Sequence, residues 1–433
     1  MARHPRTNLI LAVVATTPAL AVRLSGSSAD VSAVVRSLLF GVAIVGASLL
    51  LTWAAEVAQV DLSPGVAIGA LALVAVLPEY VVGAVFAWRG GHQFQMFGPV
   101  CQSPAAVAAG HDSPCSLALA NMMGANRLLI GIGWSLVVLV AWWRTRTTRG
   151  RLLHGVVLER PHAVELSFLA LATLWCLTLP LRHTVSLVDT CVLLAVFGGY
   201  AVRLLGAPAT EPDLEGVAAW IGARPPARRR SAALAMMGFA AVIVFLCAST
   251  FADALVEAGH SWGVGDYFLV QWVAPLASEA PELIIAAMYA WRLRASVGLG
   301  ALVSSKVNQW TLLVGSLPIF FAIASSSLHG LPLGLSQREE LGLTAAQSVF
   351  GVAVLGNLEV STAEAIALFG LFISEFVLSV ALPGPDRGRV RLMFTTLYLV
   401  AGTVILLVKR RDAVALVRDG LHTPHRHLHQ PRH

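Results

Sequence analysis

Two stretches of the chain are copies of one another. Residues 78–89 read PEYVVGAVFAWR, and residues 281–292 read PELIIAAMYAWR. Both begin with Pro-Glu, continue with a pair of β-branched residues, and end with an aromatic residue followed by Ala-Trp-Arg. Recurrence of one ordered pattern within a chain indicates that a larger structural unit has been repeated.

The segments around these copies are apolar and long. Of 433 residues, 57% are hydrophobic and only 12% are charged, about half the charged fraction of a soluble domain. About twelve segments approach the roughly 20 apolar residues that span a bilayer. The first segment could instead belong to a signal peptide, because it is short and follows two arginines. The segments are 8–24, 34–58, 64–88, 114–143, 163–180, 185–205, 232–257, 264–291, 295–325, 341–358, 361–382 and 390–408.

Each half of the chain contains five corresponding segments. A second match supports this, because SLVDTCVLLAVFG from Ser186 resembles STAEAIALFGLFI from Ser361 in hydropathy and in its acidic residue. An odd number of spans per repeat forces the two repeats into opposite orientations, as in many secondary transporters. The predicted fold is an all-α polytopic membrane protein with two inverted five-helix repeats and one extra helix at each end. The expected parts are an N-terminal segment (1–33), the first repeat (34–205), a basic linker (206–231), the second repeat (232–382), an extra helix (383–409) and a His/Arg-rich tail (410–433).

The net charge of +6 does not indicate nucleic-acid binding, because the basic residues lie between apolar segments. Most of the 30 arginines and lysines fall on one side if the N-terminus is inside, so we expect a plasma-membrane protein with both termini in the cytoplasm. The loop between Cys101 and Cys115 then lies outside, where a disulfide is one of two possibilities. The histidines of the tail could bind a metal, but we favour a solvated tail because no helix is expected there.

Glu79 and Glu282 each follow a proline in the middle of an apolar segment. A carboxylate at that depth costs at least about 2.5–3.5 kcal/mol, so it indicates function. The prolines release the carbonyls of Val74 and Ala277 from the helix ladder. A free carbonyl beside a carboxylate is a ligand pair for a hard cation such as Ca²⁺ or Na⁺. A purely structural pairing of each Glu with an Arg is the alternative, and the symmetry of the two copies disfavours it.

A Pro-Glu helix followed by an Asn-containing helix, present twice, resembles the α-repeats of the calcium/cation antiporter superfamily, which includes the sodium/calcium exchangers. The family pattern is G-T-S-x-P-E on one helix and G-S-N-x-x-N on the next. Here the first helices read VAVLPE (74–79) and ASEAPE (277–282), and the next ones read NMMGANRLLIG (121–131) and SSKVNQWTLLVG (304–315). The resemblance is specific at Pro-Glu and weaker elsewhere.

The resemblance implies a cation site at the membrane midplane, built from carboxylate, hydroxyl, amide and carbonyl oxygens. Its two metal-binding carboxylates would be Glu79 and Glu282. Ser304 and Asn308 are spaced i,i+4 and share one helix face, so both could point at the site. Such polar residues could equally hold helices together. The implied ligands, with a register that one motif asparagine could shift, are Glu79, Glu282, Asn126, Asn308, Ser304 and Ser278.

Three charged residues depart from the family pattern and could tune the site: Glu279, Lys306 and Arg127. Lys306 lies about 200° around its helix from Ser304 and Asn308, so it should face a neighbouring helix. Its ammonium could replace a bound cation or shift the pKa of a carboxylate. Alternatively Lys306 and Glu279 form a structural ion pair, which the sequence slightly favours.

These features predict a secondary active antiporter that exchanges Ca²⁺ (or Na⁺) against Na⁺ or H⁺ by alternating access. A Na⁺/H⁺ or other monovalent cation/proton exchanger is the alternative on the same fold, and a cation channel is the alternative from another class. No nucleotide-binding or H-E-x-x-H motif is present, so we expect neither an enzyme nor an ATP-driven pump. The expected partners are the lipid bilayer and inorganic cations, without a cofactor, nucleic acid or obligate protein partner.

Overall fold

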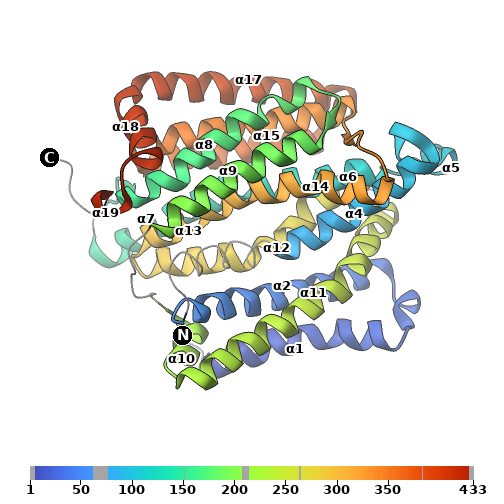
Figure 1. The fold of residues 1–433 in the computed structure, drawn as a ribbon, viewed down its shortest axis with the longest axis horizontal. Helices are drawn as coiled ribbons and strands as arrows, with labels where there is room; N and C mark the ends of the chain where they lie inside the picture. Colours follow the sequence, from blue (N-terminus) through green and yellow to red (C-terminus); the bar gives the residue numbers. More distant parts are fainter. Residues whose placement is uncertain are drawn as a thin grey trace. The chain divides into compact units, whose positions relative to one another are not determined.

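The computed structural model describes residues 5–61, 77–150, 152–206, 214–262, 265–382 and 384–428 (Figure 1). Within them the secondary structure is helical apart from four two- or three-residue strands. Its internal contacts divide it into two compact units. Unit 1 comprises Met1–Met122, Ala207–Pro281 and Phe320–Ser326, and unit 2 comprises Met123–Gly206, Glu282–Ile319 and Ser327–His433.

Ten helices among the described residues are long and apolar enough to cross a membrane, which confirms the predicted all-α membrane fold. Two expected segments are not among the ten. Residues 64–76 of the third segment lie outside the described residues, as does Val74, and only α4 (Leu77–Phe97) is described there. The expected segment 341–358 is α15 (Leu335–Val354), which starts earlier and includes charged residues in its first turns.

Unit 1 is built on long helices that lie side by side. In Figure 1, α1 and α2 pack against α11, and small residues make the approach close. A Cβ at Gly46 would lie 2.7 Å from the carbonyl oxygen of Ala12, so only glycine fits where α2 meets α1. The described helices of this unit are α1 (Pro5–Leu24), η1 (Ser27–Asp30), α2 (Ala33–Ala58), α4, η2 (Gly98–Val100), α5 (Pro104–Ala108), the first part of α6 (Pro114–Leu128), α10 (Gly216–Gly222), α11 (Pro226–Trp262), the first part of α12 (Asp266–Trp291) and the end of α14 (Val314–Ser325).

Unit 2 contains two helices that are each interrupted by a π-helical turn. The turn η3 (Leu129–Trp134) separates α6 from α7 (Ser135–Arg149), and η6 (Gln309–Leu313) separates α13 (Ala295–Asn308) from α14. Such turns are frequent at functional sites. The other helices of this unit are η4 (Arg160–His162), α8 (Ala163–Cys176), η5 (Leu179–Leu181), α9 (Leu187–Leu205), α15, η7 (Leu355–Asn357), α16 (Thr362–Ala381), α17 (Gly384–Val408), α18 (Arg410–Leu421) and α19 (His425–Leu428).

Two short antiparallel strand pairs connect distant loops of unit 2. β1 (Gly155–Val157) pairs with β4 (Glu359–Ser361), and β2 (Thr184–Val185) pairs with β3 (Leu331–Pro332). The sequence did not predict these strands. Each pair joins two loops that the alternation of spans places on the same membrane face, so the pairs agree with the expected order of crossings.

The matched segments that begin at Ser186 and Ser361 fold alike. Both serines are the N-caps of their helices, α9 and α16, and both form capping boxes with the acidic residue three positions later. In each box the acidic side chain accepts from the backbone N–H of the cap, at 2.8 Å for Asp189 and for Glu364. The repeat seen in the sequence therefore extends to the way these helices start.

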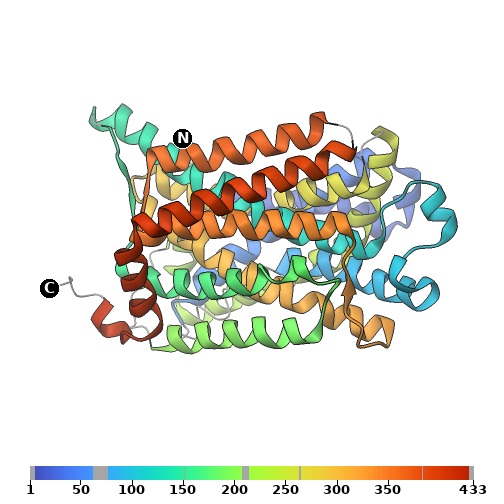
Figure 2. The same ribbon diagram turned by 90° about the horizontal axis from the view of Figure 1, so that it is seen from above.

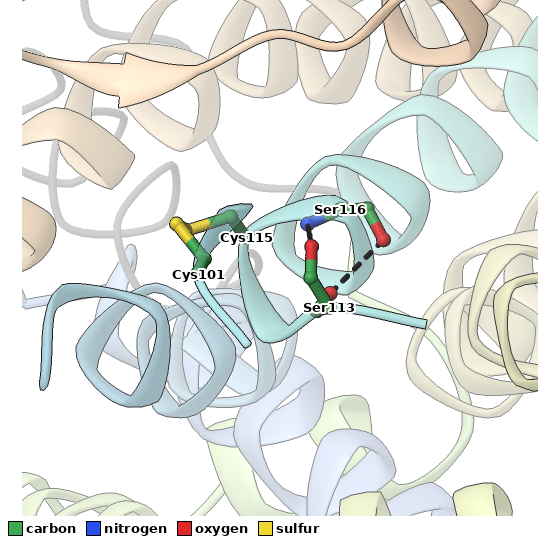
Figure 3. Close-up of a disulfide and its surroundings, with 4 residues drawn as sticks. All are labelled: Cys101, Ser113, Cys115 and Ser116. Atoms are coloured by element: carbon green, nitrogen blue, oxygen red, sulfur yellow. Dashed lines mark hydrogen bonds between the residues drawn. A yellow bond between two sulfur atoms is a disulfide. The ribbon is translucent and has the colours of Figure 1, made fainter. Parts of the chain in front are cut away.

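The loop with two cysteines contains a disulfide between Cys101 and Cys115, whose Cα atoms are 6.1 Å apart (Figure 3). Next to it, the backbone N–H of Ser116 donates to the hydroxyl of Ser113 at 3.2 Å and starts α6. A Cβ at Gly90 of α4 would lie 2.8 Å from the sulfur of Cys115. The disulfide thus fixes the start of α6 against α4.

The basic linker expected at 206–231 is partly helical. It contains α10, and α11 already begins at Pro226 and includes three of the arginines. Arg229 donates to both carboxylate oxygens of Asp61, at 2.6 and 2.7 Å, and Arg230 lies 3.0 Å from the same side chain. The hydrogen bond from Arg229 holds the pKa of Asp61 well below its usual range. These ion pairs explain why α11 starts earlier than expected.

The expectation of a solvated tail was wrong. After α17 the chain turns into α18, as Figure 2 shows, and α18 packs on α8. Asp419 accepts from the Arg160 guanidinium at 2.8 Å, and Arg203 donates to the carbonyl of Gly420 at 3.0 Å. Polar partners from η4 and α9 therefore order the tail up to residue 428, and His429 and His433 lie outside the described residues.

Candidate cation-binding site

In unit 1 three helices meet at Glu79. Glu79 lies in the first turn of α4 and is only 2% exposed. The hydroxyl of Ser278, on α12, lies 3.4 Å from its Oε1 atom, and the amide of Asn121, on α6, donates to its backbone carbonyl at 3.5 Å. Asn121 is absent from the predicted ligands, although it begins the NMMGANRLLIG stretch that carries the family resemblance. A buried carboxylate of α4 and a buried hydroxyl of α12 thus lie close together.

Ser278 has a choice of acceptors for its single proton. Its hydroxyl oxygen also lies 3.3 Å from the carbonyl oxygen of Ala274 and 3.2 Å from that of Pro275. A hydroxyl has one donor and two acceptor lone pairs. When its proton points at the helix carbonyls, the hydroxyl of Ser278 presents a lone pair on the side of Glu79. This lone pair could coordinate a cation.

The proline before Glu282 lies inside a continuous helix. α12 runs from Asp266 to Trp291 through Pro275 and Pro281. Because Pro281 has no N–H, the carbonyl of Ala277 lacks its usual helical donor. Glu279 is 3% exposed on the same helix, and Glu282 is half-buried. Glu79 and Glu279 belong to unit 1 and Glu282 to unit 2, so the shared site of the two Pro-Glu carboxylates stays a prediction.

In unit 2 Lys306 binds Asn126. Its Nζ atom donates to the backbone carbonyl of Asn126 at 2.5 Å and to its side-chain oxygen at 2.7 Å. The ammonium also lies 5.2 Å from the ring centroid of Trp310. Lys306 and Asn126 are both 0% exposed. Both oxygens of one predicted cation ligand are therefore occupied by an ammonium.

The π-helical turns give a structural register for the two repeats. Asn126 lies three residues before η3, and Lys306 lies three residues before η6. Asn308, which the sequence matched with Asn126, lies directly before η6. By this criterion the position that holds Asn126 in the first repeat holds Lys306 in the second.

Arg127 lies in a network of ion pairs in unit 2. Its guanidinium donates to Glu340 at 2.9 Å and also to Glu375, and all three side chains are nearly fully buried. Arg391 lies 2.8 Å from the other oxygen of Glu340. The predicted tuning residue Arg127 is therefore engaged by carboxylates of α15 and α16.

Ser304 and Asn308 contribute polar atoms on one face of α13. The hydroxyl of Ser304 lies 3.5 Å from Glu165 of α8 and accepts a hydrogen bond of the same length from Tyr200 of α9. Asn308 is 3% exposed, and within the described part of the chain its side-chain oxygen has no hydrogen-bond partner. Such an oxygen is costly unless something occupies it, which fits a ligand role. Glu165 was not predicted as a site residue, because its segment holds no motif.

The chain matches the family model described as sodium/calcium exchanger protein over residues 31–206 and again over 232–381. The structure of the H⁺/Ca²⁺ exchanger CAX is similar over 98% of both chains, with 36% identity and a TM-score of 0.85. Native YfkE is 12% identical, with a TM-score of 0.61 over 86% of this chain and 98% of its own. The sodium-calcium exchanger NCX_Mj is 16% identical, with a TM-score of 0.50 over 81% and 98%.

The likeness to YfkE and NCX_Mj concerns the fold alone, and no curated protein sequence matches significantly. The family model, in contrast, covers most of the chain as two separate matches, one in each half. The resemblance inferred from the Pro-Glu helices is confirmed. The chain is a multi-pass membrane protein of the sodium/calcium exchanger family, a cation transporter rather than an enzyme.

Proposed function

We propose that this protein exchanges Ca²⁺ against H⁺ across the membrane, with Glu79 and Glu282 as the carboxylates that bind the transported ion. The H⁺/Ca²⁺ exchanger that is similar over 98% of both chains supports this choice of ions. The observation that carries the proposal is the buried pair of Glu79 and Ser278. Carboxylate and neutral oxygens are the ligands that Ca²⁺ prefers.

Exchange follows from the cost of bare charge in the membrane. Two carboxylates without a cation are expensive at that depth. One Ca²⁺ or two protons neutralise them equally, and a proton on a carboxylate oxygen competes with a cation for it. The site would therefore switch its access from one side of the membrane to the other when it holds either one Ca²⁺ or two protons. The half-buried Glu282, the hydroxyl of Ser278 and the vacant amide oxygen of Asn308 are the proposed further ligands.

The proposed arrangement is two inverted repeats, over 34–205 and 232–382, in a plasma membrane with both termini in the cytoplasm. The excess of arginine on one side of the spans supports the orientation. The two strand pairs support the alternation of faces, because each pair joins loops expected on one side.

Ca²⁺ uptake into proteoliposomes tests the function. We expect uptake when an outward H⁺ gradient is imposed in Na⁺-free medium, and loss of uptake when an ionophore removes the gradient. Uptake that requires a Na⁺ gradient would replace H⁺ by Na⁺ as the coupling ion. Ca²⁺ flux that continues without any counter-ion would indicate a channel and contradict exchange. Glu257→Gln is the control, because Glu257 is a surface residue paired with Arg36.

A further inference from the structure

We propose that the ammonium of Lys306 is a built-in cation, which permanently occupies a monovalent-cation site formed by Asn126 and the ring of Trp310. The contacts of Lys306 with Asn126 and Trp310 are of the kind that a bound Na⁺, K⁺ or ammonium ion would make. Its Nζ atom lies 2.5 Å from one oxygen of Asn126 and 2.7 Å from the other, with the Trp310 ring below it. The consequence for transport rests on the proposed Ca²⁺/H⁺ exchange, whereas the existence of the cation site does not.

The site is rigid and dry. Asn126, Lys306 and Trp310 are each 0% exposed. The indole N–H of Trp310 donates to the hydroxyl of Ser348 at 2.6 Å, which fixes the orientation of the ring. An ion over an aromatic face in a desolvated place is held more strongly than at a surface.

The π-helical turn explains why a backbone oxygen is available. Where an α-helix enters a π-helical turn, the hydrogen-bond ladder shifts from i+4 to i+5, so carbonyls near the junction can accept from other donors. Asn126 lies just before η3, and its carbonyl accepts from Lys306. The backbone and side-chain oxygens of one residue then form a two-oxygen clamp, which is neutral and suited to a single positive charge.

The register of the repeats points to the same role. Lys306 stands before η6 where Asn126 stands before η3. One repeat thus supplies the oxygens and the other supplies the charge that they bind. Pairing of Lys306 with Glu279, which stays a prediction, is compatible with this role, because any cation on Asn126 would attract a nearby carboxylate.

A tethered ammonium removes the need for a free monovalent cation at this site. The site is filled in every state, so no monovalent ion has to bind there and none is released there. The protein then exchanges its transported ions without Na⁺, and one positive charge stays with the protein throughout the cycle.

Two substitutions separate the charge from the volume. Lys306→Ala empties the site, whereas Lys306→Met removes the charge and keeps a side chain over Trp310. The control is Lys409→Ala, because Lys409 also binds a backbone carbonyl, an Asn amide and a carboxylate, on Val354, Asn357 and Glu364. Thermal stability of each purified full chain is measured in choline, Na⁺, K⁺ and methylammonium chloride at constant ionic strength.

We expect one of the small cations to stabilise Lys306→Ala in a saturable way, and to leave wild type and Lys306→Met unchanged. In proteoliposomes with choline, Lys306→Ala should lose Ca²⁺/H⁺ exchange by on the order of tenfold, since two buried oxygens lose their donor. The same cation should restore it. Exchange by Lys409→Ala should not depend on the cation.

Full exchange by Lys306→Ala in choline, or equal behaviour of the Ala and Met variants in all four salts, would overturn the proposal. If Lys306→Ala does not fold in choline, Lys306→Ser is purified in each cation, and failure of both variants in every salt also contradicts a cation site. If wild type exchanges no Ca²⁺, the proposed function fails, while the stability measurements still decide whether Lys306 replaces a cation.

Discussion

Arg127 and Lys306 are two buried cations of unit 2 that are held in different ways. Arg127 is 2% exposed and donates to the carboxylates of Glu340 and Glu375. Lys306 is 0% exposed and donates to the two neutral oxygens of Asn126. Two carboxylates hold the first cation, whereas the contacts of the second include two neutral oxygens of one residue. Because both side chains are almost fully buried, their partners indicate their roles better than the extent of burial does.

We expect some buried charges to stabilise the fold and others to bind the transported ion. Substitution of the two Pro-Glu carboxylates should therefore have the largest effect on transport. Glu79→Gln and Glu282→Gln should each abolish Ca²⁺/H⁺ exchange, because an amide gives the cation no negative charge. Both proteins should remain folded, since removing a buried charge relieves its desolvation cost. Proteoliposome flux together with size-exclusion profiles checks both points. Normal flux through both variants would remove these residues from the site.

Disruption of the Arg127 ion-pair network should instead lower the stability of the protein. Arg127→Met leaves Glu340 and Glu375 without this guanidinium and should cost about 3–5 kcal/mol of folding free energy. Arg89→Met is the matched control, because Arg89 pairs with Asp253 at the surface and such pairs contribute about 1 kcal/mol or less. Thermal denaturation in detergent compares the two. Equal losses would mean that the buried network has no special weight.

A further test of scaffold contacts concerns the tail, where α18 packs on α8. A Cβ at Gly420 would overlap the hydroxyl of Ser167 and the carbonyl oxygen of Ala163, where α18 crosses α8. Gly420→Ala should therefore displace α18 at a cost of about 1–3 kcal/mol and expose it to protease. Gly198→Ala is the control, because nothing lies within 4 Å of the added Cβ. Cleavage at the wild-type rate would show that α18 adapts to the added methyl group.

The smallest effect is expected at the Asp61–Arg229 pair outside the spans. The pKa of Asp61 is lowered, so its stabilising contribution is complete above the ordinary Asp pKa and is lost only as pH falls through the lower folded value. Asp61→Asn should therefore cost at most about 1 kcal/mol, equally at every pH from about 5 to 8. Melting temperatures of wild type and variant should converge only in strong acid. A difference that already shrinks between pH 7 and 5 would contradict the low pKa.

Local features of the molecule could be read from the sequence. The matched stretches at Ser186 and Ser361 encode helices that start in the same way, because capping depends on residues within one turn. Long apolar segments also give the spans directly. The family resemblance followed from the two Pro-Glu copies and the Asn-containing segments after them.

Contacts between distant residues could not be predicted in the same way. Lys306 was expected to face a neighbouring helix, but its partner Asn126 depends on how α13 packs against α6. The order of the tail depends on Asp419 meeting Arg160, far away along the chain. No local pattern marks these pairings, so the solvated tail was the reasonable but wrong expectation.

The two strand pairs of unit 2 have a consequence for biosynthesis. β1 and β2 belong to the first half of the chain, whereas their partners β4 and β3 are translated much later. The exposed edges of β1 and β2 must wait until the loops around α15 have reached their own faces of the membrane. Because closing such long loops is slow, the pairing should be among the last events of assembly. A ribosome stalled after the first repeat would therefore carry inserted helices whose loops are still accessible to chaperones and proteases.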